Sequence, residues 1–65
     1  MDWDRIEGNW TRFKGRAKQQ WERLTDEDLD LMAGRREELE GRLQMRYGHT
    51  KDRARSEIDS WLNAL

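Results

Sequence analysis

The chain has 65 residues, enough for one small domain, and it contains no cysteine and no proline. Disulfides and cysteine-based zinc sites are therefore excluded. Charged residues make up 42% of the sequence, yet 13 basic and 14 acidic residues leave a formal net charge of only −1. This balance, together with four tryptophans, indicates a hydrated helical domain rather than a disordered chain.

The apolar residues are too scattered to form a membrane span or a targeting segment. The longest apolar run covers residues 31–33, and the first residues of the chain are acidic. We therefore predict a single domain over residues 1–65, located in the cytoplasm and without membrane contact.

The first long helix is predicted from about Asn9 to Leu24, with Asn9 as its N-cap. Residues 3–8 are expected to add a short helical turn, with Trp3 and Ile6 pointing inward. Apolar residues recur every three or four positions along one face of the long helix, as in an amphipathic helix. They are Trp10, Phe13, Ala17, Trp21 and Leu24.

A second, shorter helix is expected to begin at Thr25, whose side chain can cap it. Asp28 stands at the third helical position, where a capping box normally has glutamate. Acidic residues 26–28 also complement the positive end of the helix dipole. Leu29 and Met32 supply a short apolar face before Gly34.

Two further helices complete the predicted fold. One covers Arg35 to Tyr47 and is followed by Gly48, a residue typical of the left-handed position after a helix. The other begins near Thr50 or Lys51 and runs to the end of the chain. Their apolar faces consist of Leu39, Leu43 and Tyr47 in the former and Ala54, Ile58, Trp61 and Leu65 in the latter.

A weak internal repeat relates the first long helix to the helix that begins near residue 35. Residues 13–17 (FKGRA) align with residues 39–43 (LEGRL), which places Gly15 and Gly41 at equivalent positions. A glycine inside a helix costs about 1 kcal/mol relative to alanine. We therefore expect two helical hairpins that cross closely at Gly15 and Gly41. The alternative is a chance similarity between two amphipathic helices.

The same residues give the sequence a resemblance to the CsbD-like family of bacterial stress-response proteins, closest to its YjbJ-type members. The resemblance extends over about residues 7–58 and includes Asn9-Trp10, Phe13-Lys14-Gly15, Gln20-Trp21, Leu24-Thr25-Asp26, Gly34-Arg35-Arg36, Gly41-Arg42 and Arg46-Tyr47-Gly48. It implies an all-α fold, a compact four-helix bundle of two roughly orthogonal helical hairpins of the SAM-domain-like type. It also implies induction under general or osmotic stress and no enzymatic activity.

We predict no catalytic, cofactor-binding or metal-binding residue. His49 is expected to serve a polar role in a helix connection. Asp26, Asp28, Asp30 and Glu37 match acidic positions of a calcium loop, but the sixth position carries leucine where glycine is needed, so helix capping is favoured. The expected structural residues are Trp10, Phe13, Gly15, Trp21, Leu39, Gly41, Leu43, Tyr47, Gly48, Ile58 and Trp61.

The leading functional hypothesis is a non-enzymatic stress-response protein that acts through a hydrated surface or through protein contacts, with its partner unknown. The alternative is a nucleic-acid-binding module that uses the basic face formed by Arg12, Lys14, Arg16 and Lys18. Acidic residues interleave on the later helices, so a solvated face of mixed charge is the favoured interpretation. Self-association is a third hypothesis.

Overall fold

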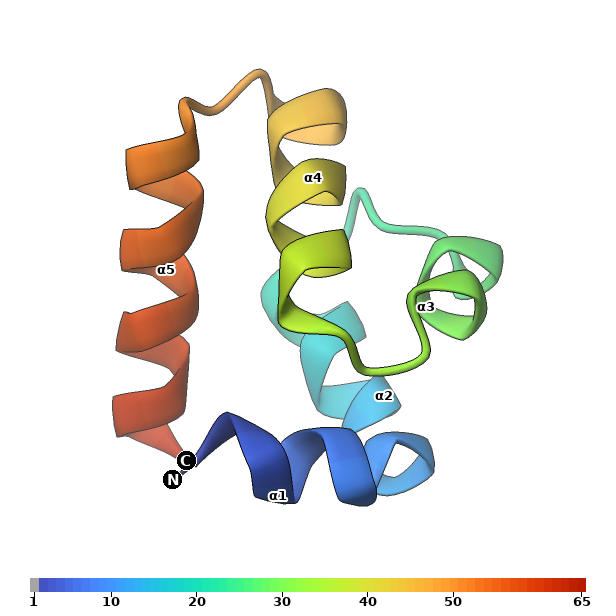
Figure 1. Cartoon of the computed structure of the whole chain (residues 1–65). Helices are drawn as coiled ribbons and strands as arrows, with labels where there is room; N and C mark the ends of the chain where they lie inside the picture. Colours follow the sequence, from blue (N-terminus) through green and yellow to red (C-terminus); the bar gives the residue numbers. More distant parts are fainter. Residues whose placement is uncertain (1) are drawn as a thin grey trace.

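A computed structural model describes residues 2–65 as five helices joined by short connections (Figure 1). In chain order they are α1 (Trp3–Gly8), α2 (Trp10–Gln20), α3 (Asp26–Met32), α4 (Arg36–Tyr47) and α5 (Lys51–Ala64). Helices α4 and α5 stand side by side and run in opposite directions, while α1 crosses below them (Figure 1). The all-helical prediction is confirmed for the described residues. The predicted number of helices, four, is wrong because residues 3–8 form a helix of their own.

Helix α2 ends at Gln20, so the predicted helix end at Leu24 is wrong. Trp21 leaves the helical conformation, with φ −126° and ψ 83°. The backbone NH of Leu24 donates to the Trp21 carbonyl (3.1 Å), and the Lys18 ammonium donates to the Leu24 carbonyl (2.7 Å). This turn still directs both Trp21 and Leu24 into the core, so their apolar spacing continues beyond the helix.

Of the two N-caps predicted from the sequence, the one at Thr25 is confirmed, and Thr50 supplies a further one. Thr25 and Asp28 make a complete capping box at the start of α3, and the Thr50 hydroxyl accepts a hydrogen bond from the Arg53 NH at the start of α5. Asn9 is the exception, because it ends α1 and begins α2 at once. Its side-chain amide donates to the Arg5 carbonyl of α1 (2.9 Å) and does not cap α2.

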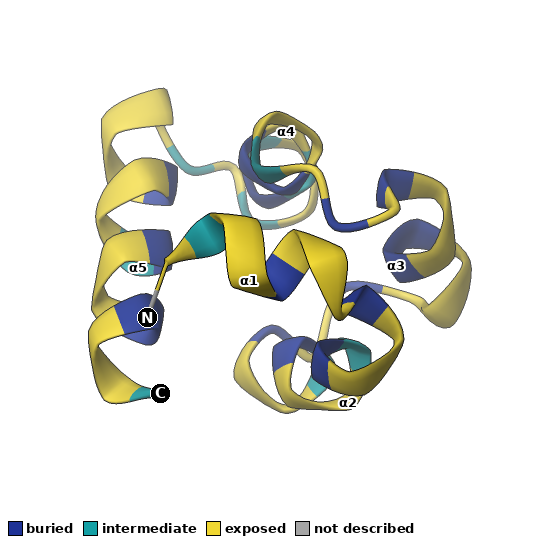
Figure 2. Cartoon of the chain, turned by 60° about the horizontal axis from the view of Figure 1, so that its bottom comes forward, coloured by how far each residue is buried: buried dark blue, intermediate teal, exposed yellow. Residues whose placement is uncertain are grey.

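Buried residues occupy the sides of the helices that face one another (Figure 2). All four indoles belong to one chain of contacts, in which Trp3 lies 6.4 Å from Trp10 and 6.2 Å from Trp61, and Trp61 lies 5.2 Å from Trp21, between ring centroids. The core consists of Ile6, Trp10, Phe13, Ala17, Trp21, Leu24, Leu29, Met32, Leu39, Leu43, Ala54, Ile58, Trp61 and Leu62. No helix among residues 2–65 has the length and apolar character that a bilayer span requires.

The close helix crossing expected at Gly15 and Gly41 is absent. A Cβ placed on either glycine meets no atom within 4 Å outside its own helix, and both residues are exposed. The close approach occurs instead at Gly34, in the connection between α3 and α4. A Cβ there would lie 3.1 Å from the Cα of Glu7 and 3.1 Å from the Cβ of Trp10. The glycine that the packing requires is therefore the one that lies against α1 and the start of α2.

Candidate functional site

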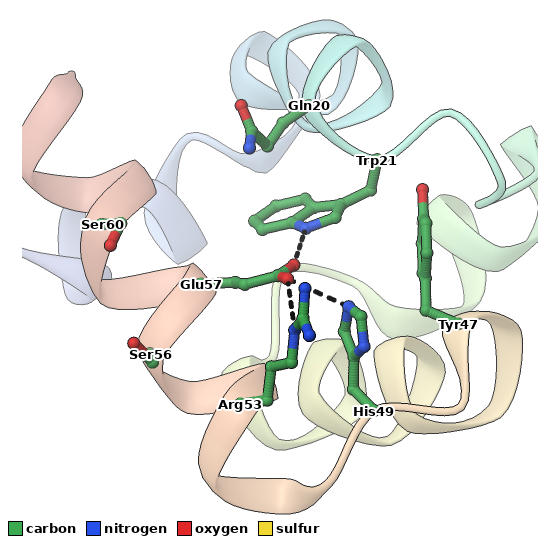
Figure 3. A pocket seen from close by; sticks show the side chains of 8 residues that line it. All are labelled: Gln20, Trp21, Tyr47, His49, Arg53, Ser56, Glu57 and Ser60. Atoms are coloured by element: carbon green, nitrogen blue, oxygen red, sulfur yellow. Dashed lines mark hydrogen bonds and ion pairs between the residues drawn. The ribbon is translucent and has the colours of Figure 1, made fainter.

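A shallow groove of about 460 Å³ lies where the ends of α2 and α4 meet α5 (Figure 3). The indole of Trp21 and the ring of Tyr47 form apolar parts of its wall, and polar side chains of α5 face them (Figure 3). The lining residues are Gln20, Trp21, Tyr47, His49, Arg53, Ser56, Glu57 and Ser60.

The carboxylate of Glu57 is the centre of this groove. It accepts hydrogen bonds from the indole NH of Trp21 (3.1 Å) and the Nε of Arg53 (3.3 Å), and its Oε2 lies 3.0 Å from the Nε2 of His49 (Figure 3). Burial alone raises the pKa of Glu57, but the hydrogen bonds from Trp21 and Arg53 and the charges of His49 and Arg53 together hold that pKa below its usual value. One carboxylate thus ties the end of α2 and the α4–α5 connection to α5.

His49 has more contacts than its predicted role in a helix connection required. Its ring stacks on Tyr47, with centroids 5.3 Å apart and planes inclined by 19°. The Tyr47 hydroxyl in turn accepts a hydrogen bond from the Arg23 backbone NH (3.1 Å), and the Arg23 guanidinium lies 5.5 Å from the Tyr47 ring centroid. Through Tyr47 and His49, these contacts link Arg23 of the α2–α3 connection to Glu57 of α5. Sequence reasoning missed the pairing of His49 with Glu57 because the two residues come from different elements.

A second polar cluster surrounds Asp28, which is only 3% exposed. In addition to the capping box, its carboxylate accepts hydrogen bonds from Arg42 Nη1 (3.1 Å) and from Arg46 Nε (3.0 Å) and Nη2 (3.1 Å). The Arg46 hydrogen bond is the main reason that the pKa of Asp28 falls from 3.8 to about 2, against the opposing effect of burial. Asp28 therefore joins α3 to α4 as an ion pair as well as capping α3.

A third cluster joins α4 to α5 through the buried Glu40. Its carboxylate lies 3.3 Å from Arg55 Nε and 3.5 Å from Arg36 Nε. Arg36 also donates to Asp59 of α5 at 2.6 Å. Charged side chains that sequence reasoning assigned to a solvated face thus form ion pairs between the two helices.

The basic residues proposed as a nucleic-acid face have different surroundings in the fold. Lys14 forms an ion pair with Asp30 of α3, and Lys18 lies 3.9 Å from Asp26 while it donates to the Leu24 carbonyl. Arg12 and Arg16 are exposed. The four residues share α2, but two of them connect α2 to the region of α3.

The acidic residues that match positions of a calcium loop are likewise dispersed. Asp26 and Asp30 take part in the lysine ion pairs of α2, and Asp28 faces the arginines of α4. Within residues 2–65, no three acidic or histidine side chains are grouped so that they could hold a metal ion.

The chain is thus a small all-helical protein whose polar clusters are built from ion pairs between helices. The CsbD-like family model matches residues 4–56. A UPF0337 protein of Rhodopseudomonas palustris is 55% identical over the whole chain, which covers 98% of that relative. One from Agrobacterium fabrum is 57% identical and YjbJ of Escherichia coli K12 is 46% identical, each over 94% of this chain and 91% and 88% of the relatives. The chain belongs to the CsbD-like family, as its sequence pattern indicated.

Proposed function

We propose that the protein is a cytoplasmic, non-enzymatic stress-response protein that acts through its hydrated surface or through protein contacts. The observation that carries this proposal is the position of its titratable side chains. Asp28, Glu40, Glu57 and His49 are each held by ion-pair or hydrogen-bond partners that join one element to another. Their role is to stabilise the fold, because their charges and hydrogen bonds are directed at neighbouring helices.

The exposed surface outside these ion pairs carries positive and negative charges that nearly cancel. The exposed residues that form no ion pair among residues 2–65 include the basic Arg5, Arg12, Arg16, Arg35 and Lys51, and the acidic Asp4, Glu7, Glu22, Glu37 and Asp52. Such side chains bind water strongly and do not favour one sign of partner. We propose that this surface protects other macromolecules during water loss, which agrees with the stress context that the family resemblance implies.

A drying assay tests this proposal. A drying-sensitive enzyme is dried and rehydrated with this protein, with an inert protein of equal mass, or with a variant in which Arg12, Arg16 and Lys51 are replaced by glutamine. We expect the native protein to preserve more activity than the inert protein, and the variant to preserve less than the native protein. Equal preservation by the native and inert proteins would contradict the proposal.

Nucleic-acid binding by the face of Arg12, Lys14, Arg16 and Lys18 is a second candidate, supported by the exposure of Arg12 and Arg16. The pairing of Lys14 and Lys18 with acids of α3 reduces the positive charge available to phosphates. Titration with duplex DNA and structured RNA at low salt tests this function. Absence of binding under those conditions would exclude it, since phosphate contacts are strongest at low salt.

We also infer that the helices are arranged as the two crossed hairpins of SAM-domain-like folds. The antiparallel pair of α4 and α5 supports one of these hairpins (Figure 1), and α2 with α3 would supply the other. Interhelical distances measured by nuclear magnetic resonance test this arrangement, and a set of distances that places α2 and α3 apart from each other would contradict it.

A further inference from the structure

Gly15 and Gly41 occupy exposed helix positions where no contact within the chain explains a glycine. Gly15 lies inside α2 and Gly41 inside α4, and a Cβ on either would enter open space. Glycine weakens a helix relative to alanine because its backbone loses more conformational freedom on folding. Each helix therefore exposes bare backbone at its glycine, where another helix can approach closely.

The charges beside the two glycines are opposite. Arg12 precedes Gly15 by one helical turn, and Glu38 precedes Gly41 by the same three positions. Arg12 forms no ion pair within residues 2–65, and Glu38 has only a weak contact of 4.0 Å with Arg42. The face of α2 around Gly15 and the face of α4 around Gly41 are thus related by the internal repeat, but they carry opposite charges.

The face around Gly41 is also hollowed, and a large apolar side chain is exposed beside the hollow. Gly41 lines a groove of about 700 Å³ between α4 and α5, and Met45, one turn after Gly41, is 62% exposed. Two arginines of this groove, Arg36 and Arg55, are neutralised by Glu40 and Asp59. Lys51 and Glu37 of the groove form no ion pair within residues 2–65 and offset each other. The charge that α4 offers to a partner beside Gly41 is therefore that of Glu38, whose own contact with Arg42 is weak.

We propose that the occupant of this face is a second copy of the chain, whose α2 packs on α4 with Gly15 against Gly41. With the two helices running in the same direction, Arg12 of one copy faces Glu38 of the other. Because the two contacting faces differ, a pair of copies keeps one face of each kind unoccupied, and the contact generates assemblies that grow with concentration. This inference is independent of the protective role proposed above.

Charge reversal tests the inference on the full-length chain by sedimentation equilibrium from micromolar to millimolar concentration. We expect the average mass of the native protein to rise with concentration at low salt and to fall toward the monomer at high salt. Arg12→Glu and Glu38→Arg should each weaken association about tenfold, because repulsion replaces an exposed ion pair. An equimolar mixture of the two variants should regain association, since each variant then finds an opposite charge on the other.

Arg5→Glu is the matched control, because Arg5 is exposed and belongs to α1 rather than to either contacting helix. It makes the same change in net charge and should leave association unchanged. Gly15→Gln should strengthen α2 in the monomer and yet abolish association, since its side chain blocks the approach of the second helix. A native protein that stays monomeric at low salt, equal effects of the Arg5 and Arg12 reversals, or no recovery in the mixture would each overturn the inference.

Discussion

Arg46 of α4 binds Asp28 of α3 through two hydrogen bonds, of 3.0 and 3.1 Å, although the two residues belong to different helices. Asp28 simultaneously completes the capping box with Thr25. The same carboxylate thus fixes the start of α3 and holds α3 against α4. Since α3 has only seven residues, it depends on such tertiary contacts more than on its own helix propensity.

Replacing Asp28 with asparagine should therefore destabilise the protein substantially. The change keeps the shape of the side chain but leaves Arg42 and Arg46 without their carboxylate. Breaking a buried ion pair costs about 3–5 kcal/mol, and we expect about 2–3 kcal/mol here because the arginines are partly exposed. Urea unfolding followed by circular dichroism measures the loss.

The matched control for this change is Asp30→Asn, also in α3. Among residues 2–65, exposed Asp30 pairs only with Lys14, so its replacement should cost less than about 1 kcal/mol. Equal losses for the two variants would show that the buried position of Asp28 has no special importance.

The depressed pKa of Asp28 predicts a loss of stability in acid. The folded-state pKa is about 2 against an ordinary value of 3.8, so the ionised carboxylate stabilises the native state above about pH 4. That contribution disappears as the pH falls from about 4 to about 2, and we expect it to amount to roughly 1–2 kcal/mol after solvent screening of the arginines. Unfolding free energies measured across this pH range should decline in the native protein.

The Asp28→Asn variant provides the control for the acid effect. It should start from a lower stability and decline less over the same interval. The lowered pKa of Glu57 acts in the same direction, so a smaller decline remains in the variant. An identical pH profile for both proteins would contradict the assignment to Asp28.

Glu57→Gln tests the carboxylate that joins Trp21, His49 and Arg53. Glutamine can still accept one hydrogen bond, but it has no charge to attract Arg53 and His49. We expect a loss of about 1 kcal/mol, together with a shift of the Trp21 indole NH resonance in nuclear magnetic resonance spectra. Glu22→Gln, at an exposed residue of the neighbouring connection, should change neither quantity. An unmoved Trp21 resonance in the Glu57 variant would disprove the contact.

Helix faces and local caps were predictable from sequence because both depend on residues close together in the chain. Thr25 finds Asp28 three positions away, and Gly48 takes the left-handed φ of 68° immediately after α4. The apolar spacing also identified Trp21 and Leu24 as buried. The same spacing led to the wrong prediction that these two residues are helical. A turn that buries two side chains three positions apart has the same apolar spacing as a helix.

The partners of the polar residues were not predictable, because they depend on how the helices pack. Nothing local links Glu57 to Trp21 or Asp28 to Arg46. Two arginines one turn apart in α4, at positions 42 and 46, are the only sequence signal that a buried acid faces that helix. The grouping of His49 with the other side chains that line the groove is likewise defined only in three dimensions (Figure 3).

The glycines provide the sharpest test of the corrected packing. Gly34 has a φ of +78° and lies against backbone of α1, so Gly34→Ala meets both strain and a clash and should cost about 2–4 kcal/mol. Gly41→Ala enters open space in a regular helix and should stabilise the monomer by about 0.5–1 kcal/mol. Thermal and urea unfolding at low protein concentration, where association is negligible, compare the two. If the close crossing were at Gly41, as the internal repeat suggested, Gly41→Ala would destabilise the protein instead.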